Sequence, residues 1–312
     1  MDIVFCGTPQ FAVPTLQALL EAGDFNVRLV VCQPDRPAGR GLQTQAPPVK
    51  QLALQRGLPV IQPERIKNNQ EFRAQLQGIR PRAIVVVAYG RIIPQWMIDL
   101  PPLGNINLHA SLLPKYRGAA PIQWAIALGE TVTGVTTMRI DAGLDTGGIL
   151  LQRELPIAPD DTAHTLAPKL AACGAPLVVE TLRGLHAGTI RPRPQDESKA
   201  TLAPLLKKED GLVDFQRTAV EINNRLRGFT PWPGAYTTFR GRTLSFWRLQ
   251  PLPSGSALLK PGALKIDSEH LYVGCGQNTT LEILELQPEG KKRTTARDFV
   301  NGYRPKTGET LG

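Results

Sequence analysis

The sequence predicts an α/β fold, with a Rossmann-like, mostly parallel sheet followed by a small C-terminal β-barrel. Two observations predict it. In the first part of the chain, short apolar and β-branched runs alternate with stretches in which apolar residues recur at helical spacing. Such alternation implies right-handed crossovers between parallel strands. In the last part, short strand candidates follow one another between glycine turns, which is typical of a small barrel.

The N-terminal part is expected to open with a buried strand at 3–6, and its strongest strand signal is AIVVVA at 83–88. The next helix begins near Phe11 and ends at Gly23. Further strand candidates are 27–32, 60–61, 105–109, 134–140 and 149–155, and further helix candidates are 48–57, 69–77, 119–128 and 162–185.

The composition changes at 189–204, TIRPRPQDESKATLAP, where proline and charge accumulate. A stretch of this kind is typical of a linker. A length of 312 residues suggests two domains. We therefore expect an N-terminal domain over 1–188, a linker over 189–204 and a C-terminal domain over 205–312. That last domain should hold one amphipathic helix at 217–226 and strands at 235–239, 243–249, 263–266, 271–274 and 280–286.

The chain is basic, with 36 Lys and Arg against 27 Asp and Glu and a formal net charge of +9. Residues 1–200 have a net charge of +4, from 20 basic and 16 acidic residues. Residues 201–312 have +5, from 16 and 11. The smaller C-terminal part is therefore more densely charged. This is a weak indication of a polyanionic partner, since many basic proteins bind nothing anionic.

Several classes of protein are disfavoured. No apolar run approaches the roughly 18–20 residues of a membrane-spanning helix, and no basic segment precedes the apolar N-terminus, as a signal peptide requires. The four cysteines are far apart and form no Cys-x-x-Cys pair, so neither a disulfide framework nor a zinc site is expected. We expect a protein of the reducing cytoplasm that binds no metal.

The turn after the first strand lacks the glycines of a dinucleotide-binding fold. It has Gly7, Thr8 and Pro9 where that fold needs G-x-G-x-x-G. An NAD-dependent enzyme is therefore disfavoured, and a tight strand-to-helix turn is the simpler interpretation.

Asn107 and His109 are the first candidates for chemistry. They are two residues apart on a predicted strand, so their side chains share one face. Both can donate a hydrogen bond to an oxygen that develops negative charge. The alternative is a structural Asn beside a core His, but the Pro/Gly-rich loop that follows favours a site.

Asp145 lies in a glycine-bracketed loop, 141–148, between two strand candidates. A hairpin turn is one interpretation. The other is that the loop presents Asp145 to His109, because a carboxylate beside a histidine can help to move protons. Asn107, His109 and Asp145 would then form an acyl-transfer site without a serine or cysteine nucleophile, suited to direct attack by an amine.

Two basic segments are candidates for phosphate contacts. Arg36 and Arg40 lie in a glycine-containing loop after the second strand, and Lys291, Lys292 and Arg293 are consecutive near the C-terminus. Either segment can also be a solvated basic loop, as charge runs usually are.

Together these segments resemble the methionyl-tRNA formyltransferase family over essentially the whole chain. The matching motifs are GTP with FA at 7–12, QPDRPAGRG at 33–41, NLHASLLPKYRGAAPIQWAI at 107–126, DAGLDTGGIL at 141–150, PWPGAY at 231–236 and GKKRTTARDFVNG at 290–302. The Asn-x-His…Asp pattern belongs to the wider group of 10-formyltetrahydrofolate-dependent formyltransferases, including glycinamide ribonucleotide and sugar-nucleotide enzymes, and so indicates the chemistry more than the acceptor. The 33–41 loop and the C-terminal motifs point to tRNA.

The resemblance implies transfer of a formyl group from 10-formyltetrahydrofolate to the α-amino group of methionyl-initiator tRNA, for translation initiation. Asn107, His109 and Asp145 match the catalytic residues. The folate-contacting positions are Tyr89, Gly90, Ser111, Leu112, Leu113, Pro114 and Asp141. Arg40 matches the tRNA-contacting loop, helped by Arg36 and by the basic Lys291, Lys292 and Arg293. The second domain should be an OB-like barrel lying along the tRNA, and a monomer is expected.

Two parts of the chain depart from the family pattern. Leu42 to Gln45 stand where members often have lysines, which weakens the electrostatic contribution of this loop, and Tyr116 replaces a common tryptophan. Three alternatives remain open from the residues: a sugar-nucleotide N-formyltransferase, a non-catalytic RNA-binding protein, and hydrolysis of 10-formyltetrahydrofolate. The basic C-terminal part favours tRNA over a small sugar, and the intact Asn107, His109 and Asp145 favour an enzyme.

Overall fold

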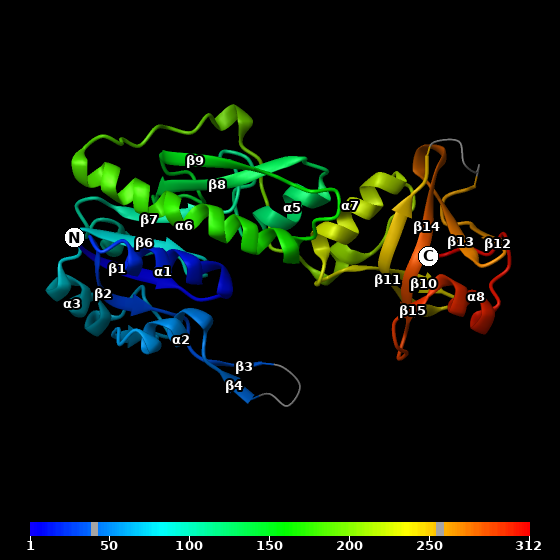
Figure 1. Ribbon diagram of the computed structural model, residues 1–312, viewed down its shortest axis with the longest axis horizontal. Helices are drawn as coiled ribbons and strands as arrows, with labels where there is room; N and C mark the ends of the chain where they lie inside the picture. The colour runs from blue at the N-terminus through cyan, green and yellow to red at the C-terminus, as the bar shows by residue number, and fades with distance from the viewer. Residues whose placement is uncertain (39–42, 254–258) are drawn as a thin grey trace. The chain divides into compact units, whose positions relative to one another are not determined.

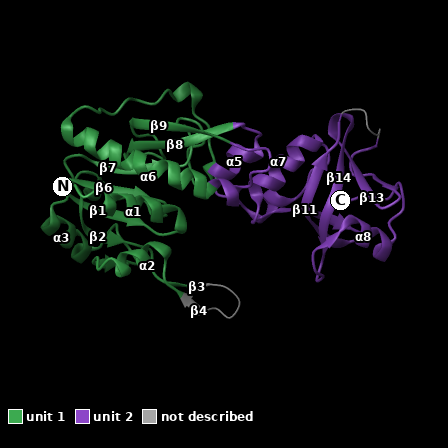
Figure 2. Cartoon of the chain, in the orientation of Figure 1, with its two compact units in different colours: residues 1–121, 132–156, 167–204 green, residues 122–131, 157–166, 205–312 purple. Residues whose placement is uncertain are grey.

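The computed structural model describes residues 1–38, 43–253 and 259–312 (Figure 1). The chain divides into two compact units (Figure 2). Unit 1 holds residues 1–121, 132–156 and 167–204, and unit 2 holds residues 122–131, 157–166 and 205–312. The segment predicted as a linker, 189–204, thus lies within unit 1. Among the described residues, no helix is both long and apolar enough to cross a membrane.

Unit 1 is built on a seven-stranded sheet with the order β5–β2–β1–β6–β7–β8–β9. The first five strands are parallel, and β8 and β9 are antiparallel. This confirms the predicted α/β fold with a mostly parallel sheet. The strands are β1 Asp2–Gly7, β2 Asn26–Val31, β5 Val60–Ile61, β6 Ala83–Val87, β7 Asn105–His109, β8 Val132–Arg139 and β9 Ile149–Pro156.

The central strands are continuous β-branched runs because both of their faces are covered, and all five residues of β6 are buried. The helices of this part are η1 Gln10–Ala12, α1 Val13–Glu21, α2 Pro48–Gln55, α3 Gln70–Ile79, α4 Gln95–Ile98 and α6 Ala163–Ala187, the last of which begins in unit 2. A small hairpin, β3 Arg36–Ala38 with β4 Gln43–Gln45, and the one-turn η2 Glu197–Lys199 complete unit 1.

The two faces of β7 are covered differently, and this positions the site. On one face, a core cluster joins Ile84 and Val86 of β6 to Phe72 of α3 and Met97 of α4. On the other face, α6 approaches so closely that a Cβ on Gly174 would lie 2.6 Å from Cδ2 of Leu108. Because side chains alternate along a strand, Asn105, Asn107 and His109 point away from α6.

Unit 2 holds a separate antiparallel sheet with the order β10–β11–β14–β13–β12, and β15 pairs with β14. Its strands are β10 Ala235–Phe239, β11 Arg242–Pro251, β12 Leu264–Asp267, β13 His270–Cys275, β14 Thr279–Pro288 and β15 Thr294–Thr295. Its helices are η3 Lys208–Gly211, α7 Ala219–Phe229, η4 Gly276–Asn278, α8 Ala296–Tyr303 and most of α5 Pro121–Ala127.

The C-terminal tail joins the two edge strands of this sheet into a barrel-like arrangement. Leu264 of β12 donates its backbone N–H to the carbonyl of Glu309, and Gly312 donates to the carbonyl of Thr238 in β10. At the start of α7, Thr218 and Glu221 bond reciprocally to each other's backbone N–H. Its apolar face, including Ile222 and Leu226, packs into the core of the sheet.

Candidate active site

Asn105 is the first of the three β7 side chains that point away from α6, and its role is structural. Asn105 is buried, and its Nδ2 donates to the carbonyl oxygens of Met97 at 2.8 Å and of Ile98 at 3.1 Å. These bonds fasten the end of α4 to the sheet. One buried polar residue of this row is thereby explained without any ligand.

His109 lies at the carboxyl end of β7 and is buried. Its Nε2 is 2.9 Å from the carbonyl oxygen of Tyr116. A carbonyl only accepts, so Nε2 carries the hydrogen in this bond. The other ring nitrogen, Nδ1, lies 3.6 Å from Oδ2 of Asp145.

Asp145 reaches this position because its loop folds back over β7. Its φ of +53° lies in the left-handed region, and its Oδ2 accepts the backbone N–H of Gly118 at 2.8 Å. Asp141 organises the same loop, since its Oδ1 accepts from the backbone of Gly143 at 3.0 Å and from Oγ1 of Thr146 at 2.7 Å. These bonds define the conformation of the loop.

Asn107 is half-buried and shares the face of His109. Within the described residues its carboxamide has no hydrogen-bond partner. Its N–H groups therefore remain available to a ligand on this face. The structure thus brings His109 and Asp145 into contact and places Asn107 one pleat away on the same strand.

Side chains of β8 and β9 hydrogen-bond to the backbone of the residues that follow β7. Thr136 donates its hydroxyl to the carbonyl of Ser111 at 2.6 Å and accepts the backbone N–H of Leu113 at 3.1 Å. Gln152 donates Nε2 to the carbonyl of Leu113 at 2.9 Å. Thr136 and Gln152 are not predicted from the sequence, because isolated polar residues in strands give no local signal. Ser111 and Leu113 are buried, whereas Leu112 and Pro114 are partly accessible.

Tyr89 and Gly90 follow β6, next to β7, at the carboxyl edge of the parallel strands. Nε2 of Gln33 donates to both of their carbonyl oxygens, at 2.8 and 3.2 Å. A Cβ on Gly90, whose φ is +74°, would lie 2.5 Å from that nitrogen. Ligands of open α/β sheets bind at this edge. The Tyr89 hydroxyl is buried without a partner among the described residues, and burial raises its pKa.

The residues predicted to contact tRNA are distributed over both units. Arg36 is exposed at the start of the β3–β4 hairpin and donates to Oε1 of Gln33 at 3.1 Å, while Arg40 lies outside the described residues. In unit 2, Lys291, Lys292 and Arg293 are all exposed. Arg293 pairs with Glu285, and its guanidinium lies 5.1 Å from the centre of the Trp247 ring.

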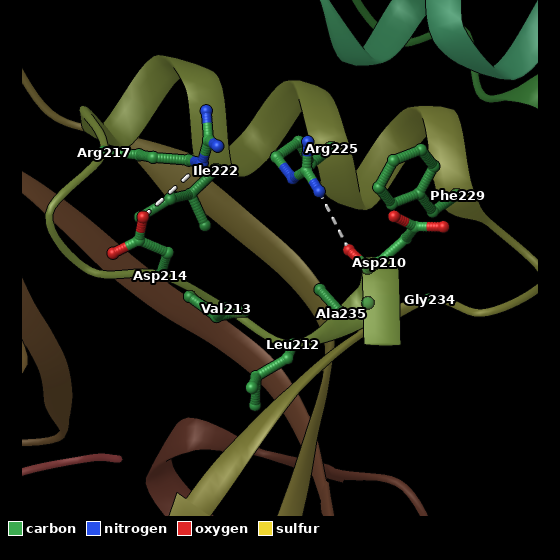
Figure 3. A pocket seen from close by; sticks show the side chains of 11 residues that line it. Asp210, Leu212, Val213, Asp214, Arg217, Ile222, Arg225, Phe229, Gly234 and Ala235 are labelled. Atoms are coloured by element: carbon green, nitrogen blue, oxygen red, sulfur yellow. Dashed lines mark hydrogen bonds and ion pairs between the residues drawn. The ribbon is translucent and has the colours of Figure 1, made fainter. Parts of the chain in front are cut away.

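A small hollow in unit 2, beside α7, contains none of the predicted site residues (Figure 3). Its polar groups bond to one another: Arg225 donates to the carbonyl of Asp210 at 3.0 Å and lies 4.8 Å from the Phe229 ring centre, and Arg217 pairs with Asp214. Over the ranges 1–38, 43–253 and 259–312, no three His, Cys, Asp or Glu side chains gather as a metal site would need.

Comparison with known proteins places both units. The formyl transferase family model matches residues 1–182, and the model of the formyl transferase C-terminal domain matches residues 205–304. A methionyl-tRNA formyltransferase of Koribacter versatilis is 65% identical over 312 residues, covering 100% of this chain and 99% of the relative. The chain belongs to the methionyl-tRNA formyltransferase family. A second member, from Acidobacterium capsulatum, is 63% identical over 302 residues, covering 97% of this chain and 96% of the relative.

Solved formyltransferases share the fold at low identity. The N-formyltransferase of Helicobacter canadensis, in complex with folinic acid and dTDP-3-aminofucose, has a TM-score of 0.68 at 18% identity and covers 92% of this chain and 98% of its own. HypX of Aquifex aeolicus, in complex with tetrahydrofolic acid, has a TM-score of 0.59 at 18% identity and covers 99% of this chain and 48% of its own. At this identity the likeness concerns the fold alone, and folate-type ligands occur among the neighbours.

Proposed function

We infer that this protein transfers the formyl group of 10-formyltetrahydrofolate to the α-amino group of methionyl-initiator tRNA. The observation that carries this is the placement of Nδ1 of His109 against the Asp145 carboxylate, in a chain that matches methionyl-tRNA formyltransferases over its full length. The product, formyl-methionyl-tRNA, serves translation initiation in the cytoplasm.

The roles of the three residues follow from their bonding. The amine attacks the formyl carbon directly, so no nucleophilic side chain is needed. The free carboxamide of Asn107 donates to the oxygen that becomes negative. Nε2 of His109 is held by Tyr116, so Nδ1 is the ring atom that takes part, and it donates to that oxygen when protonated. Asp145 lies beside the ring and receives the amine proton, directly or through one water. When the tetrahedral intermediate collapses, the bond between the formyl carbon and N10 of the folate breaks, this proton passes to N10, and tetrahydrofolate leaves.

The folate site in this proposal lies at the carboxyl edge of the parallel strands. Tyr89 and Gly90 provide backbone groups there, and the segment from Ser111 to Pro114, with Leu112 and Leu113, provides the apolar wall next to His109. Asp141 holds the conformation of the 141–148 loop, which borders the other side of the proposed folate site. A flat heterocycle suits an apolar wall edged by backbone amides and carbonyls.

The tRNA is held by the basic residues of both units. Arg36 and Arg40 serve the N-terminal catalytic part, and Lys291, Lys292 and Arg293 serve the barrel-like C-terminal part, which has the denser positive charge. Phosphate contacts of this kind position the nucleic acid without reading its sequence. No second copy of the chain is needed for this arrangement, and we propose a monomer.

The test is a formylation assay with the purified full-length protein and 10-formyltetrahydrofolate. Charged initiator tRNA, an amino-sugar nucleotide and water alone are compared as formyl acceptors. We expect formyl-methionyl-tRNA as the main product. Turnover with the amino sugar alone, or equal loss of formyl groups with and without an acceptor, contradicts the proposal.

A further inference from the structure

The segment 189–204, which has the composition of a linker, is fastened to the site of unit 1 along its length. Arg193 exchanges two backbone hydrogen bonds of 2.8 Å with Ile149, directly after the Asp145 loop. Further on, Thr201 accepts the backbone N–H of Arg117, and Ala203 donates to the carbonyl of Arg117 at 2.7 Å. The first part of the segment therefore pairs with the start of β9, directly after the Asp145 loop, and the last part pairs with the segment after His109.

Gln195 lies between these two attachments and uses its whole side-chain amide. Nε2 donates to the carbonyl oxygens of Asp145 at 2.7 Å and of Gly147 at 2.8 Å. Oε1 accepts from Nε and Nη2 of Arg117 at 3.0 and 2.8 Å. A rotated amide would set its oxygen against two carbonyls and its N–H groups against a guanidinium, so only one orientation is compatible with these partners.

Arg117 is itself held in place. Its side chain is 7% exposed, and besides Gln195 it donates to both carboxylate oxygens of Glu197, at 2.7 and 2.8 Å. This pairing raises the pKa of the Arg117 guanidinium and lowers that of the Glu197 carboxyl. Arg117 is flanked by the two backbone groups that hold the site, the Tyr116 carbonyl on His109 and the Gly118 N–H on Asp145.

Asp145 needs such support because its backbone is in an unfavourable conformation. A non-glycine residue with a φ of +53° persists only where its surroundings impose it. Gln195 binds the carbonyl of this residue, while Gly118 binds its carboxylate. Together the two contacts determine where the carboxylate lies relative to Nδ1 of His109.

We propose that Gln195 is a positioning residue for formyl transfer, which holds the Asp145 loop against the Arg117–Gly118 segment so that the carboxylate faces His109. This inference rests on the proposed function and adds to it a residue outside the motifs that predicted the site. Gln195 acts through Asp145 and has no contact with either substrate in this proposal.

The experiment compares full-length wild-type protein with Gln195→Leu and Gln195→Glu in the formylation assay. Leu removes every hydrogen bond of the amide. Glu keeps an acceptor for Arg117, and so the attachment of the segment, but removes both donors to the loop. Gln75→Leu is the matched control, because Gln75 is exposed on α3 and has no side-chain partner in the described part of the chain.

We expect kcat to fall about 10²-fold in both variants, which is the usual effect of displacing a reacting group by about 1 Å. KM for both substrates should stay near the wild-type values. Gln195→Leu should lower the melting temperature, because it leaves two carbonyls and the Arg117 guanidinium without their partner, so kcat is compared per folded protein. The control should match the wild type in every measurement.

An unchanged kcat in either variant overturns the inference. A fall in kcat that disappears when the rate is expressed per folded protein also overturns it, since the role of Gln195 is then only structural. Wild-type protein that formylates no methionyl-tRNA overturns the proposed function and this inference together. Active wild-type protein with unaffected variants overturns the inference alone.

Discussion

Oδ2 of Asp145 lies 3.6 Å from Nδ1 of His109, although 36 residues separate them along the chain. The distance exceeds a direct hydrogen bond, and one bridging water is enough to pass a proton between the two groups. Both groups also hydrogen-bond to the backbone of the segment 116–118: Nε2 of His109 donates to the carbonyl of Tyr116, and Oδ2 of Asp145 accepts from the N–H of Gly118. The pair is therefore held at a set separation before any substrate binds.

Replacing Asp145 by Asn tests the charge of this pair. The amide oxygen of the new side chain can still accept from Gly118, so the fold should persist. The carboxylate that receives the proton in the proposed mechanism is lost. We expect kcat/KM to fall about 10²–10⁴-fold in the formylation assay, with an unchanged melting temperature. Asp99→Asn, at an exposed residue directly after α4, should have wild-type activity. Full activity of the Asp145 variant contradicts the proposed proton transfer.

The two asparagines of β7 should respond in opposite ways. Asn107→Ala removes the free donor, and we expect kcat to fall about 10²–10³-fold without loss of stability. Asn105→Ala leaves two buried carbonyls without their donor, and the free energy of unfolding should fall by about 1–3 kcal/mol. Steady-state kinetics and urea unfolding of both variants measure the difference. Equal effects of the two substitutions on kcat would contradict the different roles of Asn105 and Asn107.

Gly118 cannot accept a larger side chain. Its φ is +119°, and a Cβ there would lie 2.7 Å from the carbonyl oxygen of Ala203. We expect Gly118→Ala to lower the free energy of unfolding by about 1–3 kcal/mol and to reduce kcat as well, because its N–H no longer reaches Asp145. Gly188→Ala, at an open position with a φ of +72°, is the control for backbone strain alone. Similar kinetics for both variants would contradict the role of Gly118 in the site.

The exposed lysines of unit 2 should govern the affinity for tRNA. For the double variant Lys291→Gln and Lys292→Gln, we expect a higher KM for tRNA, an unchanged KM for the folate and a weaker dependence of binding on salt, because fewer counterions are released. The pair Lys207→Gln and Lys208→Gln, also exposed in unit 2, removes the same charge. If both pairs have the same effect, only net charge matters and no local contact is made.

One surface pair should make stability depend on pH near neutrality. Glu282 lies 2.6 Å from Nδ1 of His270 and raises the pKa of this imidazole above its usual value. The stabilisation is fully present below about pH 6.5 and is lost as the pH rises through the raised pKa. The melting temperature of the wild type should thus fall more between about pH 6 and pH 8 than that of His270→Gln. The effect should be small, since the pair is exposed. Parallel curves would contradict it.

Local sequence patterns were sufficient to predict most strands and helices of the fold. The β-branched runs at 3–6, 27–32 and 83–88 became neighbouring parallel strands, because such runs are stable only when both faces are covered. Short or polar elements were missed, such as α4 Gln95–Ile98 and the two-residue β15, since their stability comes from packing and pairing more than from their own residues.

By itself, the sequence determined that Asn107 and His109 share a face, because the two-residue period of a strand is a local property. Only the tertiary structure showed that Asp145 turns back to His109, and that Gln195, Arg117 and Gly118 hold it there. Those contacts join residues up to 78 positions apart through one or two hydrogen bonds, which leave no periodic pattern in the chain. The composition of 189–204 indicated a linker because proline and charge are typical of a segment without a core of its own. Composition does not tell whether the polar side chains of such a segment hydrogen-bond to water or to other residues of the protein.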